Sequence, residues 1–135
     1  MQRFFLHTDG GARGNPGPAA IGVVLYNDQK KPVVEYKEKI GTATNNSAEY
    51  KALIKGLEIA AAYTHGILDC FLDSELLVEQ LRGKYVVKAN HLKPLFAEAK
   101  KLERAFTRVL YHHVPRENPF QARADALVNA ALDGR

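Results

Sequence analysis

The order of β-rich and helical segments restricts the fold of this chain more than any other feature of its sequence. Three β-rich segments with turn residues between them occupy the first third of the chain, which is typical of an antiparallel meander. Helical periodicity then alternates with two further short apolar runs, as in crossover connections to parallel strands. We therefore predict an α/β fold with a five-stranded mixed sheet and helices on its faces. The expected strands span residues 4–9, 19–26, 33–40, 67–72 and 109–111, and the expected helices span 48–63, 75–82, 94–106 and 122–132.

The length of 135 residues and the hydrophobic share of 46% are those of one domain with its own core, so we expect a single domain over residues 1–135. The only cysteine, Cys70, excludes an intramolecular disulfide and a thiolate metal cluster, and it fits a reducing cytosol. No apolar run approaches the length of a membrane span, and polar residues follow Met1 too soon for a signal peptide. We expect a soluble, cytoplasmic protein without a membrane partner.

The net charge of +4 is unevenly distributed along the chain. Residues 82–116 contain nine lysines and arginines against two glutamates, a balance of +7, so the remaining residues sum to −3. A localised basic stretch suggests a polyanionic partner. For any single lysine the alternative is a solvated helix face, and our hypothesis is that a subset that includes Lys84 and Lys88 contacts phosphates.

Four acidic residues stand where strands end or helices begin. Asp9 and Asp73 are expected to end the first and fourth strands, the former just before a glycine turn. Glu49 is expected in the first turn of the first helix, and Asp125 at the start of the last one. Such positions converge at the carboxyl edge of an α/β sheet. Two unit charges about 5 Å apart cost roughly 3 kcal/mol at an effective dielectric constant near 20, so the cluster needs protonation or cations.

Oxygen-only ligands favour Mg²⁺ or Mn²⁺, and two such ions can clamp an in-line phosphoryl displacement. Each acid alone also has an ordinary explanation. Asp73 with Ser74 is a helix cap, Glu49 favours the helix dipole, Asp125 is a solvated surface residue, and Asp9 belongs to a turn. Only their joint placement favours a functional site.

Four motifs in series resemble those of type 1 ribonuclease H. They cover nearly the whole chain and read DGGARGNPGPAAIG at residues 9–22, TNNSAEYKAL at 44–53, DSELLV at 73–78, and HVPREN at 113–118 together with ADALVN at 124–129. The first two are specific, and the last two gain weight from their order. The resemblance implies the ribonuclease H fold, in a short form without the N-terminal hybrid-binding domain and without the basic protrusion that some relatives insert near residues 83–90.

The resemblance also implies a metal-dependent endonuclease that hydrolyses the RNA strand of RNA/DNA hybrids by a two-metal-ion mechanism, leaving 5′-phosphate and 3′-hydroxyl ends. The expected form is a monomer. Two Mg²⁺ ions, for which Mn²⁺ is a substitute, would be held by the four catalytic carboxylates of the family, the first bridging both ions and the last being the outer ligand. These carboxylates correspond to Asp9, Glu49, Asp73 and Asp125.

Substrate contacts carry over from the family as well. The glycine-rich turn would let the backbone approach the hybrid and read 2′-hydroxyl groups. Thr44 with Asn45 corresponds to a pocket for a DNA-strand phosphate. Glu75 stands where many relatives have a substrate-contacting glutamine, and a plain first-turn helix acid is the alternative that we favour. The expected substrate-binding residues are Gly10, Gly11, Ala12, Arg13, Asn15, Thr44, Asn45, Asn46, Glu75, Lys84 and Lys88.

The loop before the last carboxylate departs from the pattern of some relatives, which carry a catalytic histidine there. Residues 115–123 contain no histidine, and Arg116 corresponds to the arginine of relatives that lack it, so we assign Arg116 that catalytic role. His7 stands two residues before Asp9, and we expect it to be structural and to point to the opposite face of the sheet.

Three other functions compete with a hybrid-specific ribonuclease. Another nuclease of the wider ribonuclease-H-like class, such as an exonuclease or a recombinase, is disfavoured by the glycine-rich motif at residues 9–17. A hybrid-binding module without activity is disfavoured by the complete set of acids. A metal-binding or structural domain without a nucleic-acid role is disfavoured by the coherent series of motifs.

Overall fold

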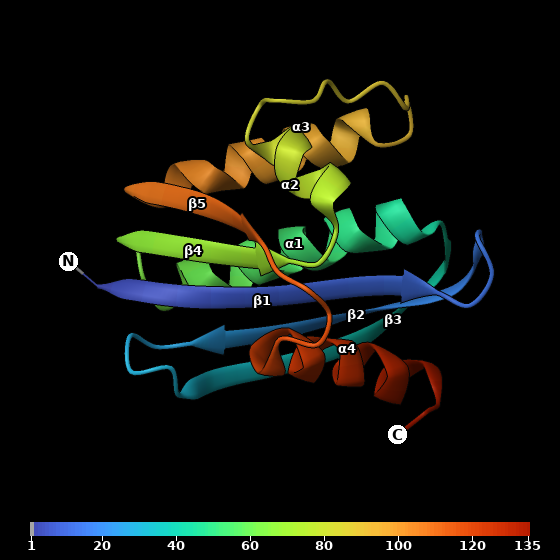
Figure 1. The fold of residues 1–135 in the computed structure, drawn as a ribbon, viewed down its shortest axis with the longest axis horizontal. Coiled ribbons are helices and arrows are strands. Elements are labelled where there is room, and N and C mark those ends of the chain that lie inside the picture. Colours follow the sequence, from blue (N-terminus) through green and yellow to red (C-terminus); the bar gives the residue numbers. More distant parts are fainter. Residues whose placement is uncertain (1) are drawn as a thin grey trace.

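One five-stranded sheet organises the computed structural model, which describes residues 2–135 (Figure 1). The strands are β1 (Arg3–Ala12), β2 (Gly17–Tyr26), β3 (Pro32–Ala43), β4 (Ile67–Leu72) and β5 (Arg108–His113), and the helices are α1 (Asn45–Ala61), α2 (Glu75–Leu81), α3 (Lys93–Leu102), the short 3₁₀ helix η1 (Glu103–Ala105) and α4 (Pro119–Leu132). The strand order is β3-β2-β1-β4-β5. β1, β2 and β3 pair antiparallel, whereas β1, β4 and β5 pair parallel. The predicted α/β fold with a five-stranded mixed sheet is therefore confirmed.

Helices cover the two faces of the sheet unequally (Figure 1). α1, α2 and α3 lie on one face, and α4 lies on the other, across β1, β2 and β3. The main core lies under α1, where Leu6 and Val23 of the sheet and Leu53 and Leu57 of the helix are fully buried. On the α4 side, no helix within residues 2–135 packs over β5 (Figure 1). None of the helices in this part of the chain is long and apolar enough to cross a membrane.

β1 runs three residues further than the sequence predicts. Its antiparallel pairing with β2 continues from Asp9 to Ala12, whereas its parallel pairing with β4 ends at His7. The predicted turn is therefore wrong, because Gly10 and Gly11 lie within a strand. Beyond His7, one edge of β1 has no strand beside it, and this geometry leaves room for a cleft.

Two helices, α1 and α4, begin three residues earlier than predicted. Thr44 caps α1 by accepting the backbone N–H of Ser47 at 3.1 Å, and Asn118 caps α4 through its side-chain oxygen. The predicted first-turn positions of Glu49 and Asp125 are therefore wrong. Both residues lie in the second turn, because the polar residues just upstream supply capping oxygens and start each helix sooner.

His7 lies on the same face of β1 as Asp9, because residues two apart in a strand share a face. The predicted opposite face is wrong: Leu6 is the residue that faces Gly56 of α1, whereas Nδ1 of His7 lies 3.0 Å from Oε1 of Gln121 in α4. Burial lowers the pKa of His7 to about 4, so the ring is neutral at pH 7. The buried ring helps to seat α4 on the sheet.

Candidate active site

A cleft of about 370 Å³ opens where β1 continues past the end of its pairing with β4. Its walls come from β1, the start of α1, the residues after β4, the loop before α4, and α4 itself. The structure thereby brings segments from both ends of the chain into one cavity. The predicted site residues in its lining are Asp9, Gly10, Gly11, Ala12, Arg13, Asn45, Asn46, Glu49, Asp73, Arg116 and Asp125.

Three carboxylates meet in this cleft. One carboxylate oxygen from each of Asp9, Glu49 and Asp73 lies within 4.8 Å of the other two. Asp9 and Glu49 are buried, with 4% and 7% of their surface exposed, and Asp73 is half-buried. Asp125 of α4 lines the same cleft outside this group of three, and Nδ2 of Asn129 donates to its carboxylate at 3.5 Å.

The position of Glu49 depends on a glycine in β1. A Cβ atom on Gly10 would overlap the backbone carbonyl of Ala48, so α1 lies directly against the strand. This close approach lets the N–H of Gly10 donate to Oε1 of Glu49 at 3.1 Å. The missing Cβ of Gly10 therefore seats a helix, and the predicted contact of Gly10 with nucleic acid stays a prediction. Gly11 keeps an open side, since a Cβ there would meet only Val128 at 3.7 Å.

A second glycine positions α4. A Cβ atom on Gly22 of β2 would overlap the carbonyl oxygen of Ala124, so the helix backbone rests on the strand. Nearby, Nε2 of Gln121 donates to the backbone oxygen of Thr8 at 2.8 Å. These contacts fix the helix that carries Asp125.

Burial makes the charged forms of the clustered acids unfavourable. It raises the pKa of Asp9 to about 7, and the charges of Asp73 and Asp125 act in the same direction. The pKa of Glu49 is raised well above its ordinary value by burial and then by Asp9. Burial also raises the pKa of Asp73, although Arg116 opposes this shift. The cluster therefore has more negative charge than the neighbouring protein groups compensate.

Two oxygens of the cluster make no hydrogen bond within residues 2–135. They are Oε2 of Glu49 and Oδ2 of Asp73, and both are buried. Buried polar atoms in proteins nearly always have a partner. Oδ2 of Asp73 has only the guanidinium of Arg116 at 3.6 Å, so both oxygens call for a closer partner. Mg²⁺ takes oxygen ligands, usually from one or two carboxylates, and Mn²⁺ prefers the same donors. The donor set, its charge and its raised pKa values fit a divalent cation.

Arg116 lies beside the third carboxylate. Its Nε is 3.6 Å from Oδ2 of Asp73, and its side chain is 70% exposed. The negative charges of Asp73 and Asp125 raise the pKa of Arg116, so the guanidinium stays protonated. An exposed cation at the mouth of an acidic cleft can meet a phosphate, but the predicted catalytic role of Arg116 stays a prediction.

Hydrogen bonds join the predicted asparagines at one end of the cleft. Oδ1 of Asn15 accepts the backbone N–H of Asn45 at 3.0 Å, and Oδ1 of Asn45 accepts the N–H of Ala12 at 2.9 Å. These bonds tie the loop after β1 to the start of α1. Asn15 and the α1 cap Thr44 stand next to cleft-lining residues without lining the cleft themselves.

Besides Asn15 and Thr44, three further predicted substrate residues lie outside the cleft. Glu75 is exposed in the first turn of α2. Nζ of Lys84 lies 3.8 Å from Glu79, and Lys88 is exposed in the segment between α2 and α3. Any contact that they make must be with a ligand that extends beyond the cleft.

Two polar residues of the cleft, Ser74 and Asn129, were not predicted as site residues. Ser74 was identified only as a helix cap, which it is, since its Oγ accepts the N–H of Leu77 at 3.3 Å. Asn129 also accepts from Arg13 at 3.5 Å. Its place one helical turn after Asp125 is the signal that could have found it, because residues four apart share a helix face.

Comparison with known proteins relates the chain to nucleic-acid enzymes. A family model described as reverse transcriptase-like matches residues 7–131. The ribonuclease HI of Halobacterium salinarum is 42% identical over 131 residues, which is 97% of this chain. A bifunctional protein of Mycobacterium tuberculosis is 42% identical over 129 residues, or 95% of this chain. The chain spans 65% of the length of the first relative and 35% of the second.

Solved structures of ribonucleases H share the fold. The N-terminal ribonuclease H domain of the mycobacterial protein superposes with a TM-score of 0.94 and 39% identity, covering 99% of this chain and 96% of that one. The ribonuclease H1 of Halobacterium salinarum gives a TM-score of 0.92 and 41% identity over 98% of this chain and 99% of that one. A ribonuclease H1 isolated from compost, solved in complex with an RNA/DNA hybrid, gives 0.91 and 41% over 97% of both chains.

Proposed function

The chain belongs to the type 1 ribonuclease H family, and from that premise we propose that it is an endonuclease that hydrolyses the RNA strand of RNA/DNA hybrids with divalent metal ions. The hybrid complex of a relative with 41% identity over 97% of both chains supports this choice of substrate. The complete motif series, with all four acids, also supports an active enzyme over a binding module.

The convergence of Asp9, Glu49 and Asp73 carries this proposal. Burying three acids within 4.8 Å of one another destabilises a fold unless a cation compensates them. A merely structural domain has no use for such a cluster. In a cleft that is open to solvent, the same arrangement can hold cations against a phosphodiester.

Each acid has a distinct part in the proposed chemistry. When bound, two Mg²⁺ ions activate water and stabilise the leaving 3′ oxygen, which yields 5′-phosphate and 3′-hydroxyl ends. Asp9, Glu49 and Asp73 would hold the ions, and Asp125 would be the outer ligand. Because Gly10 fixes Oε1 of Glu49, Oε2 is left for ligation. Arg116 would attract the RNA phosphate with its protonated guanidinium.

Recognition of the hybrid depends on groups that remain free in the cleft. The N–H groups of Gly10 and Ala12 already donate to side chains of α1, so they are not available to a ligand. The open side of Gly11, the side-chain nitrogen of Asn45 and the amide group of Asn46 remain in the cleft and can reach 2′-hydroxyl groups in the minor groove. These contacts would distinguish RNA from DNA.

The decisive test is cleavage of an end-labelled RNA/DNA hybrid in Mg²⁺ or Mn²⁺, beside double-stranded DNA, single-stranded RNA and double-stranded RNA. We expect cuts in the RNA strand of the hybrid, with a 3′-hydroxyl on the upstream product. Failure to cut the hybrid, or equal cutting of double-stranded DNA, contradicts the proposal.

A matched pair of variants tests whether cleavage depends on the clustered acids in particular or on any loss of negative charge. Asp9→Asn should abolish cleavage, whereas Asp28→Asn, which changes an exposed acid in the β2–β3 turn, should leave it intact. A single-domain organisation, a monomeric state and a cytoplasmic location remain predictions from the sequence.

A further inference from the structure

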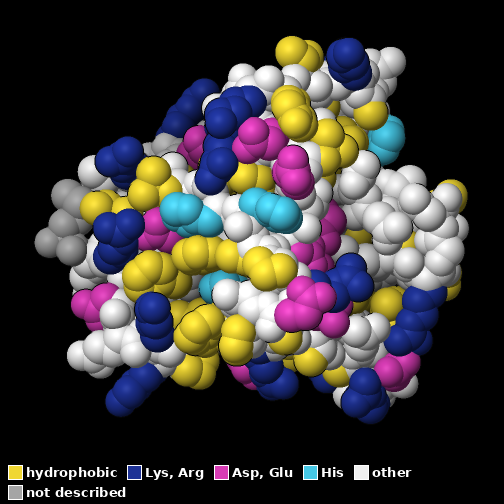
Figure 2. Space-filling view, viewed as in Figure 1, with side chains coloured by type: hydrophobic (Ala, Val, Ile, Leu, Met, Phe, Trp, Pro, Cys, Tyr) yellow, Lys and Arg dark blue, Asp and Glu magenta, His cyan; other side chains and the backbone are white. Residues whose placement is uncertain are grey.

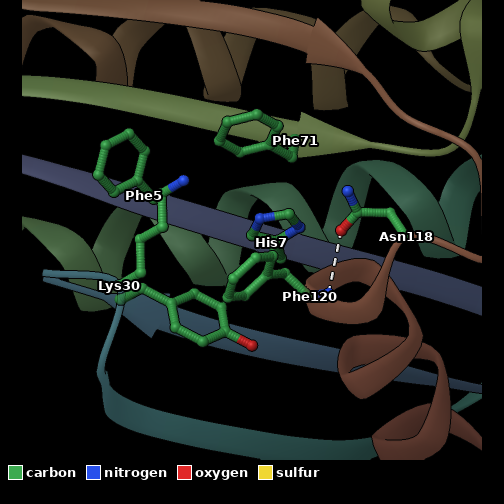
Figure 3. Close-up of a pocket in the computed structure, with 7 residues that line it drawn as sticks. Phe5, His7, Lys30, Phe71, Asn118 and Phe120 are labelled. Carbon is green, nitrogen blue, oxygen red and sulfur yellow. Dashed lines mark hydrogen bonds between the residues drawn. The ribbon is translucent and has the colours of Figure 1, made fainter. Parts of the chain in front are cut away.

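A second pocket, of about 170 Å³, lies on the α4 side of the sheet (Figure 3). Its walls come from β1, β4, the β2–β3 turn and the start of α4, and they are mainly aromatic. Figure 2 shows hydrophobic side chains gathered on this face, with histidine rings beside them and lysine and arginine side chains around them. The residues labelled in Figure 3 are Phe5, His7, Lys30, Phe71, Asn118 and Phe120.

A row of stacked rings crosses three strands at this pocket. His7, Phe71 and His112 stand opposite one another in the β1–β4–β5 register. The centroids of His7 and Phe71 are 4.5 Å apart with the rings 5° from parallel, and those of Phe71 and His112 are 4.8 Å apart. Hydrogen bonds to Gln121 and Asp69 hold the two histidines. The rings are therefore already ordered. Because the two histidines cover both faces of Phe71, a flat ligand would lie against the ring edges of this row and against the half-buried rings of Phe5 and Phe120, at little cost in side-chain ordering.

One cation is held over this aromatic surface. Lys30 has a φ of 62°, a left-handed conformation that is uncommon for residues with a side chain. The side chain of Asn27 accepts the N–H groups of Gln29 and Lys31 and fixes this turn. Nζ of Lys30 lies 6.0 Å from the ring centroid of Phe120. Lys30 makes no ion pair within residues 2–135, and no carboxylate lines the pocket.

The pocket is adjacent to the catalytic cleft. His7 of the pocket and Asp9 of the cleft are two residues apart on the same face of β1, which is about 7 Å, or the rise of about two stacked nucleotides. The loop before α4 also joins the two sites, since Arg116 lines the cleft and Asn118 lines the pocket. The two sites are therefore neighbours along β1 and along the loop before α4.

We propose that this pocket binds one unpaired nucleobase of a single-stranded extension on the hybrid substrate, with the adjoining phosphate on Lys30. The proposal rests on the proposed ribonuclease function. The base must be unpaired, because a base inside a duplex has both faces covered by its neighbours. Stacking on aromatic side chains tolerates any base, so the pocket would add affinity without sequence preference.

A protein segment with an aromatic and an acidic side chain would satisfy the same ring and charge chemistry. Two observations favour the nucleotide. The pocket lies beside the cleft that would hold the hybrid, and no carboxylate among residues 2–135 lines it to compete for its lysine. A protein partner requires neither feature.

The test compares a blunt hybrid with hybrids that carry one short unpaired extension, placed in turn at each of the four strand ends. We expect KM for one extended hybrid to be about tenfold lower than for the blunt hybrid, the scale of one base–aromatic stack. A 2-aminopurine in that extension should lose fluorescence on binding to the Glu49→Gln variant, whose cleavage is expected to be blocked.

Variants in the pocket should remove this advantage selectively. Lys30→Glu should raise KM for the extended hybrid to the blunt value, with kcat on the blunt hybrid and Tm close to the parent values. Phe71→Leu should raise this KM as well but lower Tm, because the Phe71 ring packs between His7 and His112. Lys31→Glu makes the same charge change at the neighbouring position of the turn, outside the pocket lining, and should keep the advantage.

The outcomes separate the two proposals. No cleavage of the blunt hybrid contradicts the proposed function itself. Cleavage of the blunt hybrid with the same KM for every extension overturns the pocket proposal alone. A labelled peptide with one phenylalanine between glutamates tests the protein alternative. If this peptide binds the parent but not Lys30→Glu, and the extensions do not change KM, the pocket is a protein-docking site and the nucleobase assignment is wrong.

Discussion

Gly22 lies directly opposite Asp9 in the antiparallel pair of β1 and β2. The missing Cβ of Gly22 lets the backbone of α4 rest on β2 at Ala124, immediately before Asp125. The glycine therefore sets how close the acid on the helix comes to the acid on the strand. A residue with no functional group of its own positions part of the site.

Replacing this glycine should damage both stability and activity. Gly22→Ala forces the backbone of α4 away from β2, and overpacking of this kind costs about 1–3 kcal/mol. We expect a lower Tm and a lower kcat on the hybrid. Gly11→Ala is the stability control, because its Cβ would meet only Val128 at 3.7 Å. An unchanged Tm in Gly22→Ala would show that α4 is not seated as described.

Neutralising a clustered acid should separate stability from activity. Glu49→Gln keeps an oxygen to accept the N–H of Gly10 but removes a buried charge, so Tm in EDTA should rise. Cleavage should fall by about 100-fold or more, the scale of losing a main charge-stabilising group in a site. Mg²⁺ should raise the Tm of the parent and not of the variant. Full activity in Glu49→Gln would contradict the assignment of metal ligands.

Because the pKa of Asp9 is raised, the stability of the metal-free protein should fall as pH rises. Its folded-state pKa of about 7 lies above the ordinary value of about 3.9, so Asp9 contributes stability that is fully present below pH 4 and lost as pH rises through 7. In EDTA, Tm should therefore fall between about pH 4 and pH 8, and less so in Asp9→Asn. Affinity for Mg²⁺, measured by calorimetry, should rise across pH 6–8 as protons stop competing.

Arg116 can be tested through the pH–rate profile. It opposes the rise that burial causes in the pKa of Asp73, so Arg116→Ala should raise that pKa further. The acidic limb of the profile for kcat/KM should then move to higher pH, and Arg116→Lys should restore part of the shift. An unmoved limb with lower kcat would instead favour a role in contact with substrate alone.

The two exposed lysines differ in what they can give to the hybrid. Nζ of Lys84 already lies 3.8 Å from Glu79, whereas Lys88 makes no ion pair within residues 2–135. If lysine–phosphate contacts help to bind the hybrid, KM should rise with salt concentration. Lys88→Ala should then lower the slope of log KM against log salt concentration by about 1 between roughly 50 and 200 mM, and Lys84→Ala should lower it by less. A slope that neither variant changes would remove both lysines from the substrate interface.

Asp69 should matter to stability and not to chemistry. Its side chain is 2% exposed, and Arg3 and His112 bond to it at 2.7 Å and 2.8 Å. Burial alone would raise its pKa, but these bonds outweigh burial and lower it. A lowered pKa means stability that is present above about pH 4 and lost as pH falls through the folded-state value.

Asp69→Asn should therefore cost about 1–2 kcal/mol in urea unfolding at pH 7, since both partners are partly exposed and solvent screens them. The difference from the parent should shrink below pH 3. A constant difference at all pH values would mean that packing, and not charge, explains the loss.

The order of elements and the identity of the acids could be predicted from the sequence because both are local properties. The apolar run at residues 67–72 and the helical spacing around Leu53 report which residues are buried when a strand or a helix packs on a core. The set of Asp9, Glu49, Asp73 and Asp125 followed from motif spacing. Element ends were less accurate, since Thr44 and Asn118 start helices through one and two side-chain hydrogen bonds that periodicity does not register.

Only the tertiary structure decided the register between strands and the distance between the backbones of packed elements. The sequence placed Gly10 and Gly11 in a turn, yet β1 continues through them because β2 offers an antiparallel partner along its full length. The stacking of His7 on Phe71 depends on a strand register that joins residues far apart in the chain. Local pattern fixes which residues are buried, whereas the register of the sheet and the closest approach of a helix to a strand are decided by contacts that form only when the whole chain is packed.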